Sequence, residues 1–295
     1  MAAVDTDVEE LDGRPAKAEP AATRRGTWRR RLPILLPAGT VAIIALACFA
    51  LPQVVTMPAP TGGDVLTSQL PPGSPGHALG TDLNGNDIVS RLLHGGQASL
   101  IVAVAVNLLG LFLGGALGAL SGYLSGMFDN VIMRFLDVLI AFPALVLTLA
   151  IAQALGPSQR NTILALAFFA IPAFARIARA ATLRLCELPF MAAAQLCGTS
   201  GWRILFRHIA PNIGPQLLSF MLLGMGIIIV TEGALSFLGL GIPRPEPSWG
   251  NMIFEASQTL SATPMQVVWP SMALFVTVLA FNLLGENLRS RWSSR

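Results

Sequence analysis

The sequence predicts an all-α polytopic membrane protein with six transmembrane helices. Three observations support this fold class: composition, six apolar segments long enough to cross a bilayer, and the grouping of basic residues. Of the 295 residues, 53% are hydrophobic and only 12% are charged, and the mean hydropathy is +0.64. A soluble globular protein has about 25% charged residues, and a disordered chain needs low hydrophobicity, so both classes are excluded.

The nineteen Lys and Arg residues fall into groups that predict the orientation of the chain. Seven precede residue 32, six lie in or beside the middle, and three close the sequence. Arg91, Arg160 and Arg244 stand apart, one in each of three other connections. Because cytoplasmic loops carry the excess of Lys and Arg, we expect the basic middle segment and both termini to be cytoplasmic.

The first predicted unit is a disordered cytoplasmic tail, residues 1–31, rich in Ala, Pro and charged residues. Residues 32–51 follow as an uncharged run that can cross about 30 Å of hydrocarbon. A cleaved signal or a twin-arginine address at Arg24 and Arg25 is disfavoured, because the run is long and five more spans follow. Residues 32–96 are therefore predicted to be the first transmembrane helix and an external loop.

The second span, about residues 99–123, carries glycines at intervals of four. They are Gly110, Gly114, Gly118, Gly122 and Gly126. Residues four apart share one face of a helix, and glycines there let a second backbone approach closely. We therefore expect this face to pack against another helix, although membrane helices also tolerate glycine without such packing.

Four further spans complete the predicted bundle: about residues 131–155, 162–180, 213–238 and 265–284. The transmembrane domain is assigned to residues 97–286, with a cytoplasmic loop at 187–211 and a cytoplasmic tail at 287–295.

The cytoplasmic loop is predicted to form a helix, a glycine turn and a second helix. Pro189 suits the first position of a helix, and Gly198 stands where a left-handed residue commonly ends one. We expect Pro211 to stop the second helix. Apolar residues of that helix follow helical spacing, with two arginines on another face: Trp202, Leu205, Phe206 and Ile209, then Arg203 and Arg207.

Three functions fit such an element. A DNA-reading helix-turn-helix is disfavoured because the element is short, lies between two membrane spans and lacks a third supporting helix. An interfacial helix in the lipid headgroups is a second alternative. The hypothesis that we favour is a docking element whose apolar ridge inserts into a groove of a cytoplasmic partner.

The residues of this loop resemble a known family. The segment from Phe190 to Gly198, followed by Ile209-Ala-Pro211-Asn212, is similar to the coupling loop of ABC importer permeases, although Ala192 replaces the usual Glu. Two further blocks, residues 77–100 and 232–250, resemble the C-type subunit of dipeptide and oligopeptide permeases. Asn86 and Gln97 replace arginines often found in the first of these blocks.

The resemblance implies a type I ABC importer permease with defined partners. These are a homologous B-type permease, two cytoplasmic ATPases and an external solute-binding protein, besides membrane lipid and without nucleic acid. It also implies that the loop transmits ATPase movement. The loop residues assigned to coupling are Ala193, Ala194, Gly198, Trp202, Arg203, Leu205, Phe206, Arg207, Ile209 and Pro211.

The chain itself is not expected to be an enzyme or to hold a cofactor or metal. Its single lysine, Lys17, is not in a Gly-Lys-Ser/Thr motif, so ATP and Mg²⁺ are expected on partner ATPase chains. The three cysteines and three histidines are scattered. The Asp82-to-Asp87 segment lacks the Gly and Glu of a calcium loop and is predicted to be a hydrogen-bonded external turn.

Ionisable residues within predicted spans are candidate translocation-pathway residues. Arg134 and Asp137 are three apart and could instead pair with each other. Glu232, near the outer end of the fifth span, could line the pathway or tie the helix end to the external segment.

We therefore expect an ATP-driven importer subunit for di- or oligopeptides in the bacterial cytoplasmic membrane. The same architecture could import nickel or haem. An ion-coupled secondary carrier using Glu232 or Asp137 is the alternative from another class.

Overall fold

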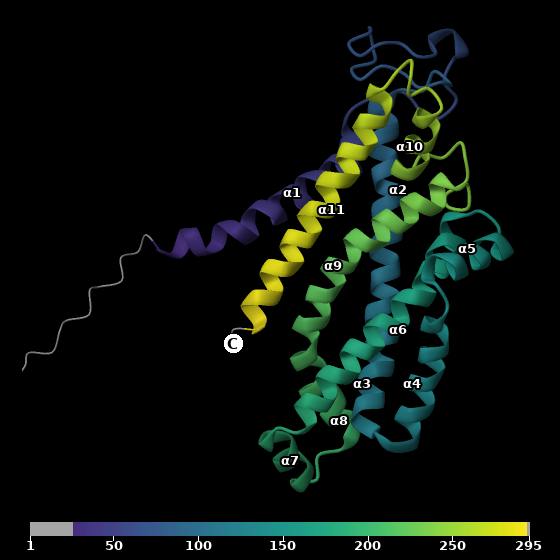
Figure 1. The fold of residues 1–295 in the computed structure, drawn as a ribbon. Helices are drawn as coiled ribbons and strands as arrows, with labels where there is room; N and C mark the ends of the chain where they lie inside the picture. The colour runs from purple at the N-terminus through teal and green to yellow at the C-terminus, as the bar shows by residue number, and fades with distance from the viewer. Residues whose placement is uncertain (1–25, 294–295) are drawn as a thin grey trace, which may run out of the picture.

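The computed structural model describes residues 26–293, which form a helical bundle (Figure 1). Five helices are long and apolar enough to cross a bilayer, and a sixth segment meets this test only as a bent pair. Six spans, as predicted, are reached when the bent pair is counted as one broken span; otherwise the described residues hold five. Residues 1–25 of the predicted disordered tail lie outside the described residues.

Helix α1 (Gly26–Val54) begins within the predicted tail, so residues 26–31 are helical. Its apolar stretch packs beside α11 and α2. It lies along one side of the bundle in Figure 1, where much of its length is clear of the other helices. The segment after α1 carries a single helical turn, η1 (Val65–Thr67), and forms a cap over one end of the bundle.

The second span is a continuous helix made of α2 (Ile88–Leu109), the π-helical turn η2 (Gly110–Gly114) and α3 (Gly115–Leu124). It begins well before the predicted start at about residue 99. Asp87 caps it, its side chain accepting a hydrogen bond from the Ser90 N–H. The early turns were missed because they contain buried polar residues, such as Arg91, in place of an uninterrupted apolar run.

The glycine face of this span packs against α6 (Gln159–Cys186). A Cβ added at Gly114 or Gly118 would collide with the backbone carbonyl of Ile171 or Ala175. Gly110 and Gly122 face the same helix, whereas Gly126 is the first residue of the next helix and has open space around it. Gly114, Gly118 and Gly122 thus allow the two backbones to approach closely, and Gly110 makes room for the Phe174 ring.

The third span is broken. α4 (Gly126–Ala141) and α5 (Ala144–Leu155) meet at a bend of 88°. Phe142 is extended and Pro143 follows it, as expected because proline disfavours helical geometry in the residue before it. The predicted continuous span over residues 131–155 is wrong for that reason.

After α6 the chain forms α7 (Pro189–Leu196), then a long helix composed of α8 (Gly201–Ile204), the π-helical turn η3 (Leu205–Ile209) and α9 (Ala210–Phe237). α7 and α8 lie at the end of the bundle opposite the cap (Figure 1). The short helix α10 (Trp249–Ser257) joins the cap, and α11 (Met265–Ser293) returns along α9. Residues 287–293 of the predicted tail are therefore helical, and the last two residues lie outside the described part.

Candidate functional site

The turn between α7 and α8 has the hydrogen bonds of a Schellman motif. Gly198 has φ +71°, its N–H donates to the Gln195 carbonyl at 2.9 Å, and the Thr199 N–H donates to the Ala194 carbonyl at 3.1 Å. This left-handed position favours glycine because it has no Cβ. At the other end, Pro189 occupies the first position of α7. The helix, glycine turn and helix predicted here are present.

Buried apolar side chains attach this element to the bundle. Met191, Ile204 and Ile209 are fully buried in the same core cluster. Tyr123 of α3 and Leu185 of α6 pack against that cluster. The element is therefore held against two membrane helices, so a force applied to α7 or α8 would reach α3 and α6 through direct packing.

The outer side of the element carries exposed apolar side chains. Trp202 and Phe206 are 68% and 66% exposed and stack on each other with ring centroids 5.5 Å apart. Leu196, in the last turn of α7, is 89% exposed. A stacked aromatic pair of this kind offers a large, conformationally restricted apolar surface to a partner groove.

The apolar residues predicted to form one ridge lie on two sides of the element, one buried against the bundle and the other exposed. Leu205 is half-buried and Ile209 is buried, so neither belongs to the exposed surface with Trp202 and Phe206. The other residues assigned to coupling are mostly exposed: Ala193, Arg203, Arg207 and Pro211 are exposed and Ala194 is half-buried.

Pro211 does not stop the second helix, contrary to the prediction from sequence. Ala210 is helical, and the helix runs on through Pro211 into α9. The π-helical turn η3 ends at Ile209, with only Ala210 between it and the proline. A π-helical turn is wider than an α-helical one, so it leaves room for the proline ring, which also has no N–H to donate. The α8 segment of the loop is thus joined to a membrane span without a break.

Glu232 lies in the interior of the bundle. Its carboxylate is completely buried and accepts hydrogen bonds from Ser99 of α2 at 2.8 Å and from Ser236 of α9 at 2.6 Å. These contacts tie the outer part of α9 to α2. They are contacts within the bundle, so both roles considered from sequence, a pathway position and a tie to the external segment, stay predictions.

Arg134 and Asp137 do not form the three-apart pair considered above. The Asp137 carboxylate accepts a hydrogen bond from Arg176 of α6 at 2.6 Å, with side chains 51% and 48% exposed. Arg134 is also exposed. Arg179 of α6 pairs with Asp129 near the start of α4. Neither cross-helix pair was predicted, because their members are 39 and 50 residues apart in sequence.

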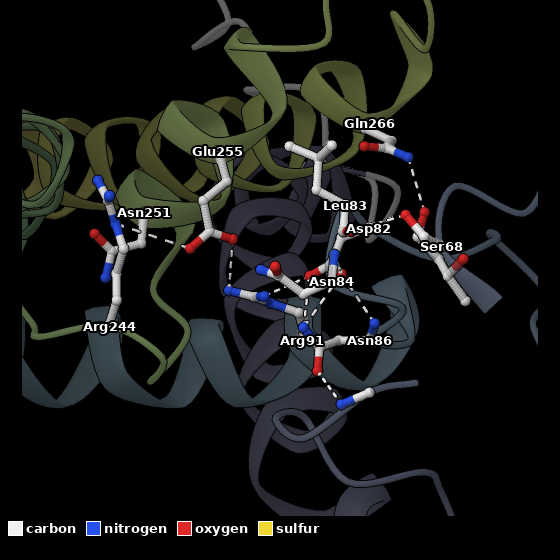
Figure 2. A network of polar contacts seen from close by, with 12 residues as sticks. Ser68, Asp82, Leu83, Asn84, Asn86, Arg91, Arg244, Asn251, Glu255 and Gln266 are labelled. Atoms are coloured by element: carbon white, nitrogen blue, oxygen red, sulfur yellow. Dashed lines mark hydrogen bonds and ion pairs between the residues drawn. The ribbon is translucent and has the colours of Figure 1, made fainter. Parts of the chain in front are cut away.

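A second polar network closes the opposite end of the molecule (Figure 2). Arg91 is buried and forms ion pairs with Asp82 of the cap and, at 2.9 Å, with Glu255 of α10. Arg244 lies 3.9 Å from the same carboxyl group. Burial raises the pKa of Glu255, the charge of Asp82 raises it further, and the guanidinium of Arg91 opposes the shift.

The predicted external turn lies within this network. The Asp82 carboxylate accepts hydrogen bonds from the Asn84 and Asn86 backbone N–H groups at 2.8 and 2.9 Å. The joining of Arg91 to Glu255 was not predicted from sequence, since nothing in the local pattern relates the two positions. Among residues 26–293, no group of three or more His, Cys, Asp or Glu residues is placed to hold a metal ion.

The chain is similar to known transport proteins. Residues 114–293 match the family described as binding-protein-dependent transport system inner membrane component. The chain is 44% identical over 216 residues to the glutathione transport system permease protein GsiD of Pectobacterium atrosepticum, covering 73% of this chain and 72% of that protein. A GsiD protein of Escherichia coli is 44% identical over 213 residues, or 72% and 70% of the two chains.

A solved structure supports the fold. A chain of the inward-facing methionine ABC transporter MetNI matches with a TM-score of 0.54 and 15% sequence identity, covering 68% of this chain and 95% of that one. At that level of identity the similarity concerns the arrangement of the helices alone.

Proposed function

This chain belongs to the family of binding-protein-dependent transport system inner membrane components, and from that premise we propose that it passes di- and oligopeptides through the membrane. It is a permease subunit of an ABC importer and a multi-pass protein of the bacterial inner membrane. Such subunits are transport components and not enzymes. The ion-coupled secondary carrier is set aside by family membership.

The support for a peptide substrate comes from the GsiD relatives, which are named for glutathione transport. Glutathione is a small peptide with free carboxylates, so a pathway that accepts it has the dimensions and polarity that short peptides need. Nickel and haem, the other solutes considered, have no comparable support. Selection among peptides is assigned to the solute-binding protein.

The observation that carries the coupling part of the proposal is the exposed pair Trp202 and Phe206 on an element anchored in the bundle. We assign this pair, with Leu196, to a groove on a cytoplasmic ATPase. Arg203 and Arg207 contribute rim contacts, and Gly198 sets the angle between α7 and α8. The α7 end of the bundle and both termini are then cytoplasmic.

The remaining partners follow from the family. ABC importers combine permease, ATPase and binding-protein components, and we assign this chain a B-type permease partner, two ATPases and one solute-binding protein. ATP and Mg²⁺ belong to the ATPases. Nucleotide-driven closure of the ATPases would move α7 and α8, and the continuous helix α8–η3–α9 would carry that movement into the membrane.

Arg134, Asp137 and Arg176 are assigned to the translocation pathway or to the subunit boundary beside it. Exposed ionised side chains on membrane helices are unfavourable toward hydrocarbon. This face therefore needs water or the second permease subunit against it. We do not assign Glu232 to the pathway, because its carboxylate is buried and hydrogen-bonded within this chain.

Uptake by the reconstituted complete complex tests the proposed function. Dipeptides, longer peptides, glutathione, haem and nickel are offered with the solute-binding protein, and internal accumulation is measured with ATP. ATP-dependent accumulation of peptides is expected. Accumulation of haem or nickel without any peptide would contradict the substrate assignment.

A further inference from the structure

A cavity of about 600 Å³, lined by polar side chains and by a larger share of apolar surface, opens between α6, α9 and α11, toward the end of the bundle that carries α7. It is lined by Arg184, Asn212, Pro215, Gln216, Ser219, Arg289 and Trp292. None of them was assigned a role from sequence. A volume of this size can hold several water molecules or a small organic group.

The lining of this cavity is suited to an anion. Arg184 and Arg289 supply guanidinium groups from α6 and α11, and Gln216 supplies an amide. Ser219 is buried, and its hydroxyl has no hydrogen-bond partner within the described part of the chain. Arg289 pairs with Glu286 at 3.0 Å, but both side chains are largely exposed, and the pair can be exchanged for an anion in the cavity.

The exposed face of α6 connects this cavity with the pathway residues. Arg176, Ala180 and Arg184 are exposed and four residues apart, so they form one stripe along the helix. Arg176, the first residue of the stripe, is half-exposed and forms the ion pair with Asp137. Since such an ion pair is unfavourable against lipid, the stripe faces water or the second permease subunit, and the cavity at its end lies beside the proposed pathway.

We infer that this cavity binds a carboxylate of an anionic peptide during the last part of its passage. The inference rests on the proposed function and adds a preferred substrate class to it. Arginine suits this role because its guanidinium donates two parallel hydrogen bonds to a carboxylate. The Gln216 amide and the Ser219 hydroxyl would then contact the remaining polar atoms of the peptide.

The test compares two tripeptides that differ by one charge, Ala-Glu-Ala and Ala-Gln-Ala. Each is delivered by saturated solute-binding protein to the complete complex in liposomes, and the two uptake rates are expressed as a ratio. A ratio cancels differences in expression, assembly and ATPase activity. In the Arg184→Gln/Arg289→Gln variant we expect the uptake rate of Ala-Glu-Ala, divided by that of Ala-Gln-Ala, to fall about fivefold.

Matched variants sharpen the result. Arg160→Gln makes the same change near the opposite end of α6 and is expected to leave the ratio unchanged. The double lysine variant, Arg184→Lys/Arg289→Lys, retains the charge and is expected to restore most of the ratio. An unchanged ratio in the double glutamine variant would overturn the inference, whether or not that variant also loses bound anionic lipid.

Failure of the proposed function is distinguishable from failure of this inference. If the wild-type complex imports neither tripeptide nor any other peptide, the proposed function is wrong. If the double glutamine variant does not assemble, binding of both tripeptides to the nucleotide-free wild-type complex is measured. Tighter binding of Ala-Glu-Ala is expected, and equal affinities would overturn the inference.

Discussion

The two ends of the helical bundle differ in where their side chains find partners. At the cap, Arg91, Asp82 and Glu255 join the loop, α2 and α10, and the Trp249 indole donates to the Leu92 carbonyl at 3.0 Å. At the α7 end, the largest side chains on the surface are an aromatic pair without a neighbour to cover it, Trp202 and Phe206. The cap is held together by its own polar contacts, although single apolar side chains such as Val65 are exposed there, whereas the α7 end presents a stacked aromatic pair that a partner can bury.

The largest effect expected from this difference is at Phe206. In the Phe206→Glu variant, a carboxylate replaces an aromatic anchor, and its desolvation opposes docking. We expect ATPase affinity to fall about thirtyfold or more, with loss of peptide uptake. Co-purification of the ATPases and their titration onto the permease pair measure the effect.

The matched control is Val65→Glu, which introduces the same charge at an exposed apolar residue of the cap. It is expected to leave ATPase affinity unchanged. If both variants lose ATPase binding to the same extent, or if neither loses it, the proposed contrast between the two ends is contradicted.

The next largest effect concerns the stability of the cap. Arg91→Met removes the cation that Asp82 and Glu255 share, leaving two carboxylates close together in a partly buried site. Breaking a buried ion pair in this way costs about 3–5 kcal/mol, so we expect a clear fall in Tm. ATPase affinity should not change.

Arg244→Met serves as the control for this prediction, because Arg244 is more exposed and lies 3.9 Å from the Glu255 carboxyl. Its effect on Tm is expected to be small. A Tm for Arg91→Met equal to that of the control would show that Arg91 does not hold the cap together.

A smaller effect is expected at the turn of the docking element. Gly198→Ala places a side chain at φ +71° with no other atom within 4 Å, so the whole effect is conformational. Such a change costs about 1 kcal/mol, which corresponds to about fivefold weaker ATPase binding if the turn must keep its shape.

Gly214→Ala provides the comparison, because Gly214 is helical and also has open space around it. That variant is expected to bind the ATPases as the wild type does. Indistinguishable affinities for the two variants would mean that the turn geometry does not matter for docking.

The smallest predicted effect is a pH dependence of the cap. The pKa of Glu255 is raised in the folded protein, so its ionised form lowers stability, and stability is gained as the pH falls from neutral through the raised pKa. We expect Glu255→Gln to reduce the difference in Tm between about pH 7.5 and about pH 5. An unaltered pH dependence in this variant would exclude Glu255 as a contributor.

Sequence reasoning succeeded where the signal was local. Glycines spaced by four indicated close packing of the second span on another helix, which is α6 in the structure. Pro189 and Gly198 bounded α7 because each residue suits one backbone position. Pro211 was misinterpreted because the π-helical turn before it has no recognisable sequence signal.

Contacts between distant segments were beyond local reasoning. Arg91 with Glu255, and Asp137 with Arg176, are joined only by the tertiary packing of helices far apart in sequence. Sequence spacing instead suggested Arg134 as the partner of Asp137, since the two are neighbours on one helix. The cavity beside Ser219 was likewise invisible, because three separate helices line it.

The claim that a partner covers the α7 end can be tested most directly at a native residue. Cys197 is exposed beside Gly198, whereas Cys48 is buried. In a Cys186→Ala background, the rate of maleimide labelling at Cys197 is compared for the permease pair with and without its ATPases. We predict labelling slowed about tenfold or more by the ATPases, because an interface core excludes water. An unchanged labelling rate in a fully assembled complex would contradict the assignment of α7 and α8 as the docking element.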